Sequence, residues 1–194
     1  MLLKHLNAFI DKYTPDYVVK FDDGSEVYKD DDKPKKFPDA TEIIVYRFFT
    51  ITKGSKFKKI KNIRTECNGK VKLVGDMSFM FHCTWFIGDV SDWDVSEVTN
   101  MSYMFYNTQV RGNCTSWDVS NVTNMSGLFY YTSFNGEISN WDVSNVTNMA
   151  YMFCKALFNR DLSNWDVSNV IDMKHMFTNT PLEKNGNLPH WYKN

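Results

Sequence analysis

The string Trp-Asp-Val-Ser occurs four times in this chain at one constant interval, beginning at Trp93, Trp117, Trp141 and Trp165. A second string, Met-x-x-(Met or Leu)-Phe, keeps the same interval and starts at Met77, Met101, Met125, Met149 and Met173. A weaker copy without tryptophan, KVKLVGDM, precedes the first full one. A repeat unit this short cannot bury its own apolar side chains, so successive units must pack against one another.

Each unit divides into three stretches. The segment around Trp-Asp-Val, such as Val90–Val95, predicts a short strand that aligns in parallel with its copies, and Ser-Asn-Val-Thr-Asn predicts a turn. In Met-x-x-Met-Phe, Met149, Met152 and Phe153 have the i, i+3, i+4 spacing of one helix face. We therefore expect an α/β solenoid of about five coils, each a short parallel strand plus a helical turn.

The positions that repeat without change are the candidate core. A ladder of tryptophans could also offer a stacking surface for sugars or bases. With methionine and phenylalanine repeating beside it, core filling is the preferred interpretation, since methionine fills irregular gaps between rings. The predicted structural ladder is Trp93, Trp117, Trp141 and Trp165 with Phe105, Phe129, Phe153 and Phe177, beside columns of valine and methionine.

Two polar columns also repeat. Asp94, Asp118, Asp142 and Asp166 would stack carboxylates about 5 Å apart, which is unfavourable unless each caps a turn or a cation lies between them. Calcium sites usually supply more carboxylates and glycines per turn, so turn capping is preferred. Asparagines at the 100, 124 and 148 positions suggest an internal hydrogen-bonded ladder. We predict no metal and no cofactor.

The chain divides into three regions by pattern. Residues 1–65 do not repeat and predict a small α+β N-terminal cap, residues 66–180 hold the repeats, and residues 181–194 form a C-terminal cap or tail. Within the cap we expect an amphipathic helix in LLKHLNAFIDKY, strands in DYVVKF and TEIIVYRFFTI, and a charged loop from 22 to 39.

Charge differs between the two ends of the chain. Residues 1–76 carry sixteen Lys and Arg against twelve Asp and Glu, and residues 77–194 carry six against eleven, which gives the total of −1. The run KGSKFKKIKNIR includes Lys53, Lys56, Lys58 and Lys59. It could grip an acidic protein surface, or it could be a solvated sheet edge that lysine protects. Nucleic acid is not an expected partner, because little aromatic interleaving accompanies the basic residues.

The string FNGEISNWDVSNVTNM resembles the BspA-like bacterial surface-protein repeat of mycoplasma type, a relative of the leucine-rich repeat that also occurs in giant DNA viruses. The resemblance covers about residues 66–180. It implies a leucine-rich-repeat-like solenoid used for adhesion or protein–protein contact, with no catalytic residues.

Function is predicted from the positions whose residues vary from one repeat to the next. No nucleophile elbow, P-loop or HExxH motif occurs, so we do not expect an enzyme, although a small one within 1–65 is a third alternative. We expect a repeat protein that binds other proteins as a structural or accessory part of a larger assembly, such as a giant-virus particle. Tyrosine is a favoured interface residue, and the candidate contact residues are Tyr103, Tyr106, Tyr130, Tyr131 and Tyr151.

Location is predicted from the lack of two signals. The first residues have no secretory signal pattern, and no run of 18 apolar residues could span a membrane. These absences favour an intracellular or virion-associated protein with reduced cysteines. The alternative is a cell-surface adhesin that binds host protein or glycan and is exported by another route. The oligomeric state is not predicted.

Overall fold

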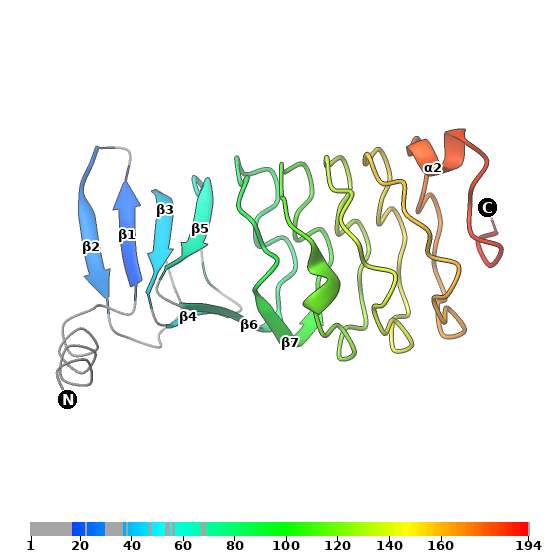
Figure 1. Ribbon diagram of the computed structural model, residues 1–194, viewed down its shortest axis with the longest axis horizontal. Coiled ribbons are helices and arrows are strands. Elements are labelled where there is room, and N and C mark those ends of the chain that lie inside the picture. Colours follow the sequence, from blue (N-terminus) through cyan, green and yellow to red (C-terminus); the bar gives the residue numbers. More distant parts are fainter. Residues whose placement is uncertain are drawn as a thin grey trace, which may run out of the picture.

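The computed structural model of the protein describes residues 17–21, 23–29, 37, 39–46, 48–52, 55, 57–66 and 69–193. Its two parts follow one another along the long axis of an elongated molecule (Figure 1). Upright strands occupy one end, and a row of similar turns of chain runs from there to the C-terminal end. The helix predicted in LLKHLNAFIDKY, residues 2–13, lies outside the described residues.

The first part is a four-stranded sheet with the order β2-β1-β3-β5. It contains β1 (Tyr17–Phe21), β2 (Glu26–Lys29), β3 (Ala40–Val45) and β5 (Asn62–Thr65). Strand β1 is antiparallel to β2 and β3, and β3 is parallel to β5. The strand predicted in DYVVKF is confirmed as β1.

The predicted loop from 22 to 39 is wrong in part, because β2 lies within it. A tight turn returns the chain from β1 to β2. Gly24 has a φ of 80°, and Asp23 Oδ1 accepts a hydrogen bond from the Ser25 backbone N–H at 2.9 Å. Glycine takes this left-handed conformation without steric cost, so the charged segment forms a hairpin.

The second sheet is parallel, with the order β4-β6-β7. It contains β4 (Phe48–Thr52), β6 (Lys70–Asp76) and β7 (Asp94–Asn100). The single strand predicted in TEIIVYRFFTI is wrong, since β3 and β4 divide it between two sheets. The strand of the first full repeat also begins later than predicted, at Asp94 rather than Val90.

Beyond β7 the described residues form no further strand, and main-chain hydrogen bonds between neighbouring turns join each repeat to the next. Isolated parallel bridges join Asn100 to Asn124, Asn124 to Asn148 and Asn148 to Asp172. From each of these points, alternate N–H groups donate to the next repeat, as Met101 donates to the Asn124 carbonyl at 2.9 Å. Equivalent positions of successive repeats therefore lie side by side.

The predicted fold class, a leucine-rich-repeat-like α/β solenoid with a helical turn in each coil, is wrong. The described residues form small mixed and parallel sheets, and their helical elements are a single 3-10 turn (η1, Cys114–Ser116) and one short helix (α2, Pro181–Lys184). Neither element falls in a Met-x-x-Met-Phe segment.

The reason is the backbone of the third residue in each Met-x-x-Met-Phe string. These residues have φ values between 53° and 60°, where a helix needs about −63°. The Phe81 N–H then donates to the Met104 carbonyl of the next repeat at 3.0 Å, not to a carbonyl four residues earlier. Between these bonds, three-residue turns close within the repeat, as when Met80 donates to the Met77 carbonyl.

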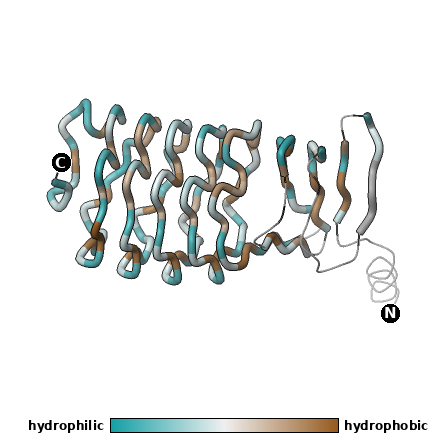
Figure 2. Tube along the Cα trace, turned by 180° about the vertical axis from the view of Figure 1, so that it is seen from behind, coloured by the Kyte–Doolittle hydropathy of each residue, from teal (hydrophilic) through white to brown (hydrophobic). Residues whose placement is uncertain are grey.

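The core is one continuous cluster that runs through both parts. The four repeat tryptophans are 4–5% exposed, and the ladder phenylalanines are fully buried. Trp117 and Trp141 stack with ring centroids 5.9 Å apart, and Phe105 and Phe129 stack at 6.0 Å. Each buried phenylalanine contributes about 2 kcal/mol through the area it removes from water. Figure 2 shows hydrophobic and hydrophilic stretches alternating within each turn of chain.

The C-terminal segment covers part of the last repeat. Helix α2 is capped by Thr180, whose hydroxyl accepts from the Glu183 N–H. Trp191 then stacks on Trp165 at 6.5 Å and donates its indole N–H to the Leu162 carbonyl. Ile171 lies outside this cover and is 87% exposed.

Candidate protein-binding surface

The left-handed residue of each repeat turn presents a side chain at the surface. It is Phe79, Tyr103, Gly127, Tyr151 or His175, according to the repeat. Bulky residues rarely adopt this conformation, which costs an L-residue roughly 1–2 kcal/mol relative to its right-handed form. Glycine, which avoids the cost, occurs here in one repeat of the five.

These residues and two neighbouring tyrosines form a continuous line of rings along the repeats. We call it the aromatic row, and its members are Phe79, Tyr103, Tyr106, Tyr130, Tyr151 and His175. Each ring contacts the next, with centroid separations of 5.2, 6.1, 5.0, 6.1 and 5.1 Å in that order. For equivalent residues of neighbouring repeats, such as Tyr106 and Tyr130, the spacing follows from the hydrogen bonds between repeats, because parallel main chains lie about 4.8 Å apart.

The rings of the aromatic row are partly open to solvent. Phe79 is 51% exposed, Tyr151 and His175 are exposed, and the other three tyrosines are half-buried. Partial burial raises the pKa of Tyr103, so its hydroxyl stays protonated and can donate a hydrogen bond. The row therefore combines apolar ring edges with hydroxyl groups.

Gly127 accommodates the ring of Tyr103. A Cβ atom at this position would lie 2.4 Å from a ring carbon of Tyr103, so any larger residue would displace that ring. Phe79 stacks on Tyr103 with an angle of 6° between the two planes. Each of these two rings therefore covers one face of the other.

Four of the five predicted tyrosines, Tyr103, Tyr106, Tyr130 and Tyr151, belong to the aromatic row. The fifth, Tyr131, is 57% exposed and also left-handed, with a φ of 57°, but it makes no ring contact within the described residues. Its side chain lines a separate cavity of about 500 Å³ with Trp85.

The two predicted basic residues that the structure describes, Lys58 and Lys59, are not part of the aromatic row. Lys58 and Lys59 are exposed in the segment before β5, and Lys59 forms a surface ion pair with Asp39 at 3.1 Å. Arg64, at the end of the basic run, pairs with Glu42 and Glu66. Lys53 and Lys56 lie outside the described residues.

Two surface aromatic residues were not predicted. Phe79 is the first ring of the aromatic row, and its position one full repeat before Tyr103 was the signal that could have identified it. Trp85, which is 73% exposed, has no counterpart in the other repeats and left no periodic signal.

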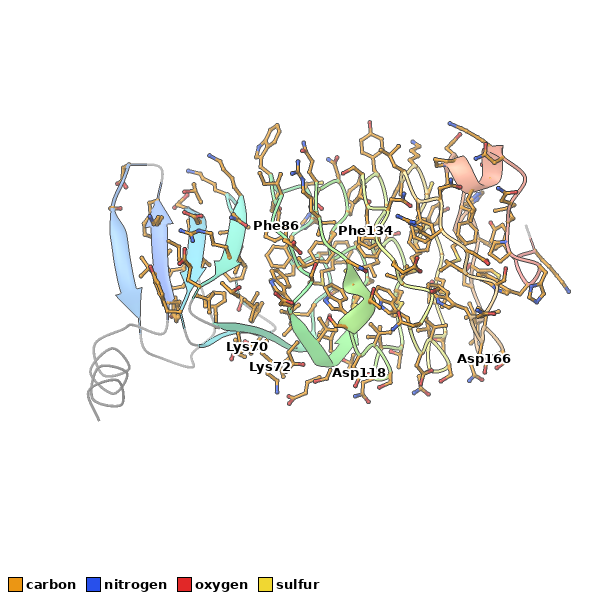
Figure 3. The ribbon with its side chains drawn as sticks, in the orientation of Figure 1. Lys70, Lys72, Phe86, Asp118, Phe134 and Asp166 are labelled. Carbon is orange, nitrogen blue, oxygen red and sulfur yellow. The ribbon has the colours of Figure 1, made fainter. Side chains whose placement is uncertain are left out.

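The repeated carboxylates cap turns, as the sequence predicts. Oδ1 of Asp142 accepts from the backbone N–H of Ser144 at 3.1 Å and from its hydroxyl at 2.6 Å, and the other three aspartates of the column accept the same backbone bond. These bonds lower the pKa of each aspartate. Figure 3 shows Asp118 and Asp166 on the same rim of the row of turns.

Two further columns of polar residues also cap turns. Asn100, Asn124 and Asn148 each accept from the N–H two residues later, at 2.9–3.0 Å. Asp89, Asn113, Glu137 and Asp161 form a third capping column, which the sequence analysis missed because its residue type changes from repeat to repeat.

In the described part of the chain, no three His, Cys, Asp or Glu side chains gather as a metal site would require. Cys83, Cys114 and Cys154 are free, and burial raises the pKa of the Cys114 thiol. None of the described helices has the length and apolar character needed to cross a bilayer.

Comparison with known proteins gives one family match. The match covers residues 51–130 and again 107–193, so it begins within β4 and extends through the last repeat. No curated protein and no solved structure matches the chain. Because the two matches together span well over half of the sequence, this chain belongs to the family described as Mycoplasma protein of unknown function, DUF285.

Proposed function

We propose that this protein binds other proteins through the aromatic row and serves as a non-enzymatic structural or accessory part of a larger assembly. The observation that carries the proposal is the line of six rings in mutual contact across five repeats. Tyrosine supplies large amphipathic contact area at low entropic cost and is enriched in protein interfaces.

The backbone cost of these rings supports the same role. Phe79, Tyr103, Tyr151 and His175 occupy left-handed positions that glycine would fill without strain. Non-glycine residues held in this region tend to occur at functional sites. Burial does not account for the rings either, because they lie at the surface while the core columns beside them are fully buried.

A protein partner fits the geometry better than a glycan or a base. Stacking of a sugar or a base needs an open ring face. In Phe79 and Tyr103 the planes lie 6° apart, so one face of each ring is already covered, and Tyr103 also packs against Gly127. Exposed edges and hydroxyl groups suit the apolar and hydrogen-bonding contacts of a protein interface.

Site-specific crosslinking tests the proposal. The photoreactive residue p-benzoylphenylalanine replaces Tyr151 in one variant and Ile171, which is 87% exposed but outside the aromatic row, in a matched control. After irradiation in the producing cell, we expect discrete protein adducts from position 151 and none from position 171. Mass spectrometry then identifies the partner, and the combined Tyr106→Ala, Tyr130→Ala variant should lose the adducts.

Equal crosslinking at both positions, or adducts that survive the loss of the two tyrosines, would contradict the proposed role of the aromatic row. The proposed setting, a giant-virus particle rather than a cell surface, has its own test. Protease treatment of intact cells and of purified particles should leave the protein intact in particles, whereas an adhesin would be cleaved on cells.

A further inference from the structure

The cavity that Trp85 and Tyr131 line spans three successive repeats. Trp85 belongs to the first of them, Asn107 and Gln109 to the second, and Tyr131 and Ser133 to the third. Because parallel main chains lie about 4.8 Å apart, the main chains that carry the two aromatic residues are about 10 Å apart along the row of repeats, with the two amide side chains between them. The cavity volume of about 500 Å³ is in the range of small-molecule sites.

The main chain beneath this cavity is fixed by hydrogen bonds between repeats. The Asn107 N–H donates to the Tyr130 carbonyl at 2.9 Å, and the Gln109 N–H donates to the Phe86 carbonyl at 3.0 Å. Figure 3 labels Phe86, which follows Trp85 in the chain and marks the first of the three repeats. The lining is therefore held in place before a ligand arrives, which lowers the entropic cost of binding.

The two aromatic side chains of the cavity are open to solvent. Trp85 is 73% exposed and Tyr131 is 57% exposed, and neither ring contacts another ring within the described residues. In the aromatic row, by contrast, Phe79 and Tyr103 each cover one face of the other. Rings as exposed as Trp85 and Tyr131 can stack against the flat side of a ligand.

The polar groups of the cavity are neutral. No Asp, Glu, Lys, Arg or His side chain is part of its lining, so nothing in the lining would balance the charge of a phosphate, a carboxylate or an ammonium group. Gln109 and Ser133 are exposed, and their side chains form no hydrogen bond with another described residue. Because amide and hydroxyl groups each supply both a donor and an acceptor, a matching ligand is uncharged and both donates and accepts.

We infer that this cavity binds a neutral saccharide, which stacks on Trp85 and Tyr131 and forms hydrogen bonds with the amide side chains between them. A sugar ring presents C–H groups on a flat face, which suit the negative face of an aromatic ring, and hydroxyl groups that both donate and accept. A proline-rich peptide also stacks on aromatic residues, but proline has no N–H to donate to the amide and hydroxyl oxygens of the cavity. A nucleotide would bring phosphate with no cation in the lining to meet it. The site uses no residue of the aromatic row and does not depend on the proposed function.

Glycan binding by the intact chain tests the inference. The fluorescently labelled protein is applied to a printed array of neutral and sialylated oligosaccharides, and we expect it to be retained by neutral ones. Trp85→Ala and Tyr131→Ala should each weaken this binding by about tenfold or more, the scale of a lost stacking contact.

Two matched controls remove similar side chains outside the cavity. Leu157 occupies the repeat position of Trp85 three repeats later and is 60% exposed, and Tyr151 is, like Tyr131, an exposed left-handed tyrosine. Leu157→Ala and Tyr151→Ala should bind the array as the unsubstituted protein does, and all four variants should keep its circular dichroism spectrum.

Nuclear magnetic resonance then locates the site. In ¹⁵N-tryptophan-labelled protein, the Trp85 indole signal is the one that Trp85→Phe removes. The best-retained neutral oligosaccharide, added free in solution, should shift this signal saturably and leave those of the buried Trp117 and Trp141 in place.

Four outcomes would overturn the inference. They are an array that retains no protein, retention by sialylated glycans alone, retention that both Trp85→Ala and Tyr131→Ala leave unchanged, and a shift of the Trp85 signal by a proline decapeptide but not by the oligosaccharide.

Discussion

Substituting Lys155 by glycine and by alanine tests a second left-handed residue of the repeat, which follows the Met149–Phe153 string by two residues. Lys155 has a φ of 57°, its side chain is exposed, and its backbone N–H donates to the Thr178 carbonyl. The two substitutions remove the same surface side chain, so the difference between them reports the backbone. Alanine keeps the strain of a left-handed L-residue, about 1–2 kcal/mol, and glycine removes it.

The magnitude follows from two opposing terms. Glycine loses about 0.5–1 kcal/mol through the extra freedom of its unfolded chain. The net expectation is that the free energy of unfolding of Lys155→Gly exceeds that of Lys155→Ala by about 0.5–1 kcal/mol. In a helix the order would reverse, with alanine ahead by about 1 kcal/mol.

Urea unfolding followed by circular dichroism measures this difference, provided that both variants unfold with the same dependence on denaturant. Ser133, an exposed surface residue whose φ is not positive, serves as a control site. Glycine there should be no better than alanine. A greater stability of Lys155→Ala than of Lys155→Gly would refute the left-handed backbone.

Three further predictions concern the core, the capping carboxylates and Gly127. Trp141→Phe should lower the free energy of unfolding by about 1 kcal/mol more than Trp93→Phe, because the Trp141 indole N–H donates to the Cys114 carbonyl while no described residue accepts from that of Trp93. Equal losses in urea unfolding would contradict the assignment. In the folded protein, hydrogen bonds from the serine two residues later lower the pKa values of Asp118, Asp142 and Asp166. The stability that these carboxylates contribute is therefore fully present above about pH 4, and it is lost as the pH falls through the lowered pKa values. Thermal unfolding between pH 2 and 6 should show this loss, and Asp142→Asn, which keeps an acceptor but does not titrate, should weaken the pH dependence while changing stability little at pH 7. Gly127→Ala should destabilise the protein by about 1–2 kcal/mol, because the residue is left-handed and a Cβ atom would displace the Tyr103 ring. Unchanged stability in the same urea assay would count against both the left-handed backbone and the close contact with the ring.

The parts of the fold that repeat were the parts that the sequence could predict. The constant interval between repeats identifies which side chains share a column, and apolar character indicates which columns are buried. The capping role of Asp142 also followed from local chemistry, because a carboxylate two residues before a serine can accept its N–H and hydroxyl.

The local backbone was not predictable in the same way. Met149, Met152 and Phe153 have the spacing of a helix face, yet Tyr151 between them is left-handed, a conformation that glycine rather than tyrosine normally signals. Hydrogen bonds to the next repeat decide the outcome, and such bonds are invisible in a single repeat. The division of TEIIVYRFFTI between two sheets is likewise set by pairing with distant strands.

The aromatic row was predicted only as separate tyrosines at variable positions. Its continuity depends on contacts between the left-handed residues and the tyrosines beside them, and on the contact of Tyr106 with Tyr130.

Scalar couplings across hydrogen bonds test the main-chain register most directly, and the aromatic row depends on that register. The structure pairs the Tyr151 N–H with the Lys174 carbonyl of the next repeat at 2.9 Å. In uniformly ¹³C,¹⁵N-labelled protein we expect a coupling between the Tyr151 nitrogen and the Lys174 carbonyl carbon. A coupling from the same nitrogen to the carbonyl carbon of Thr147, four residues earlier, would mean a helix within the repeat and would contradict the account.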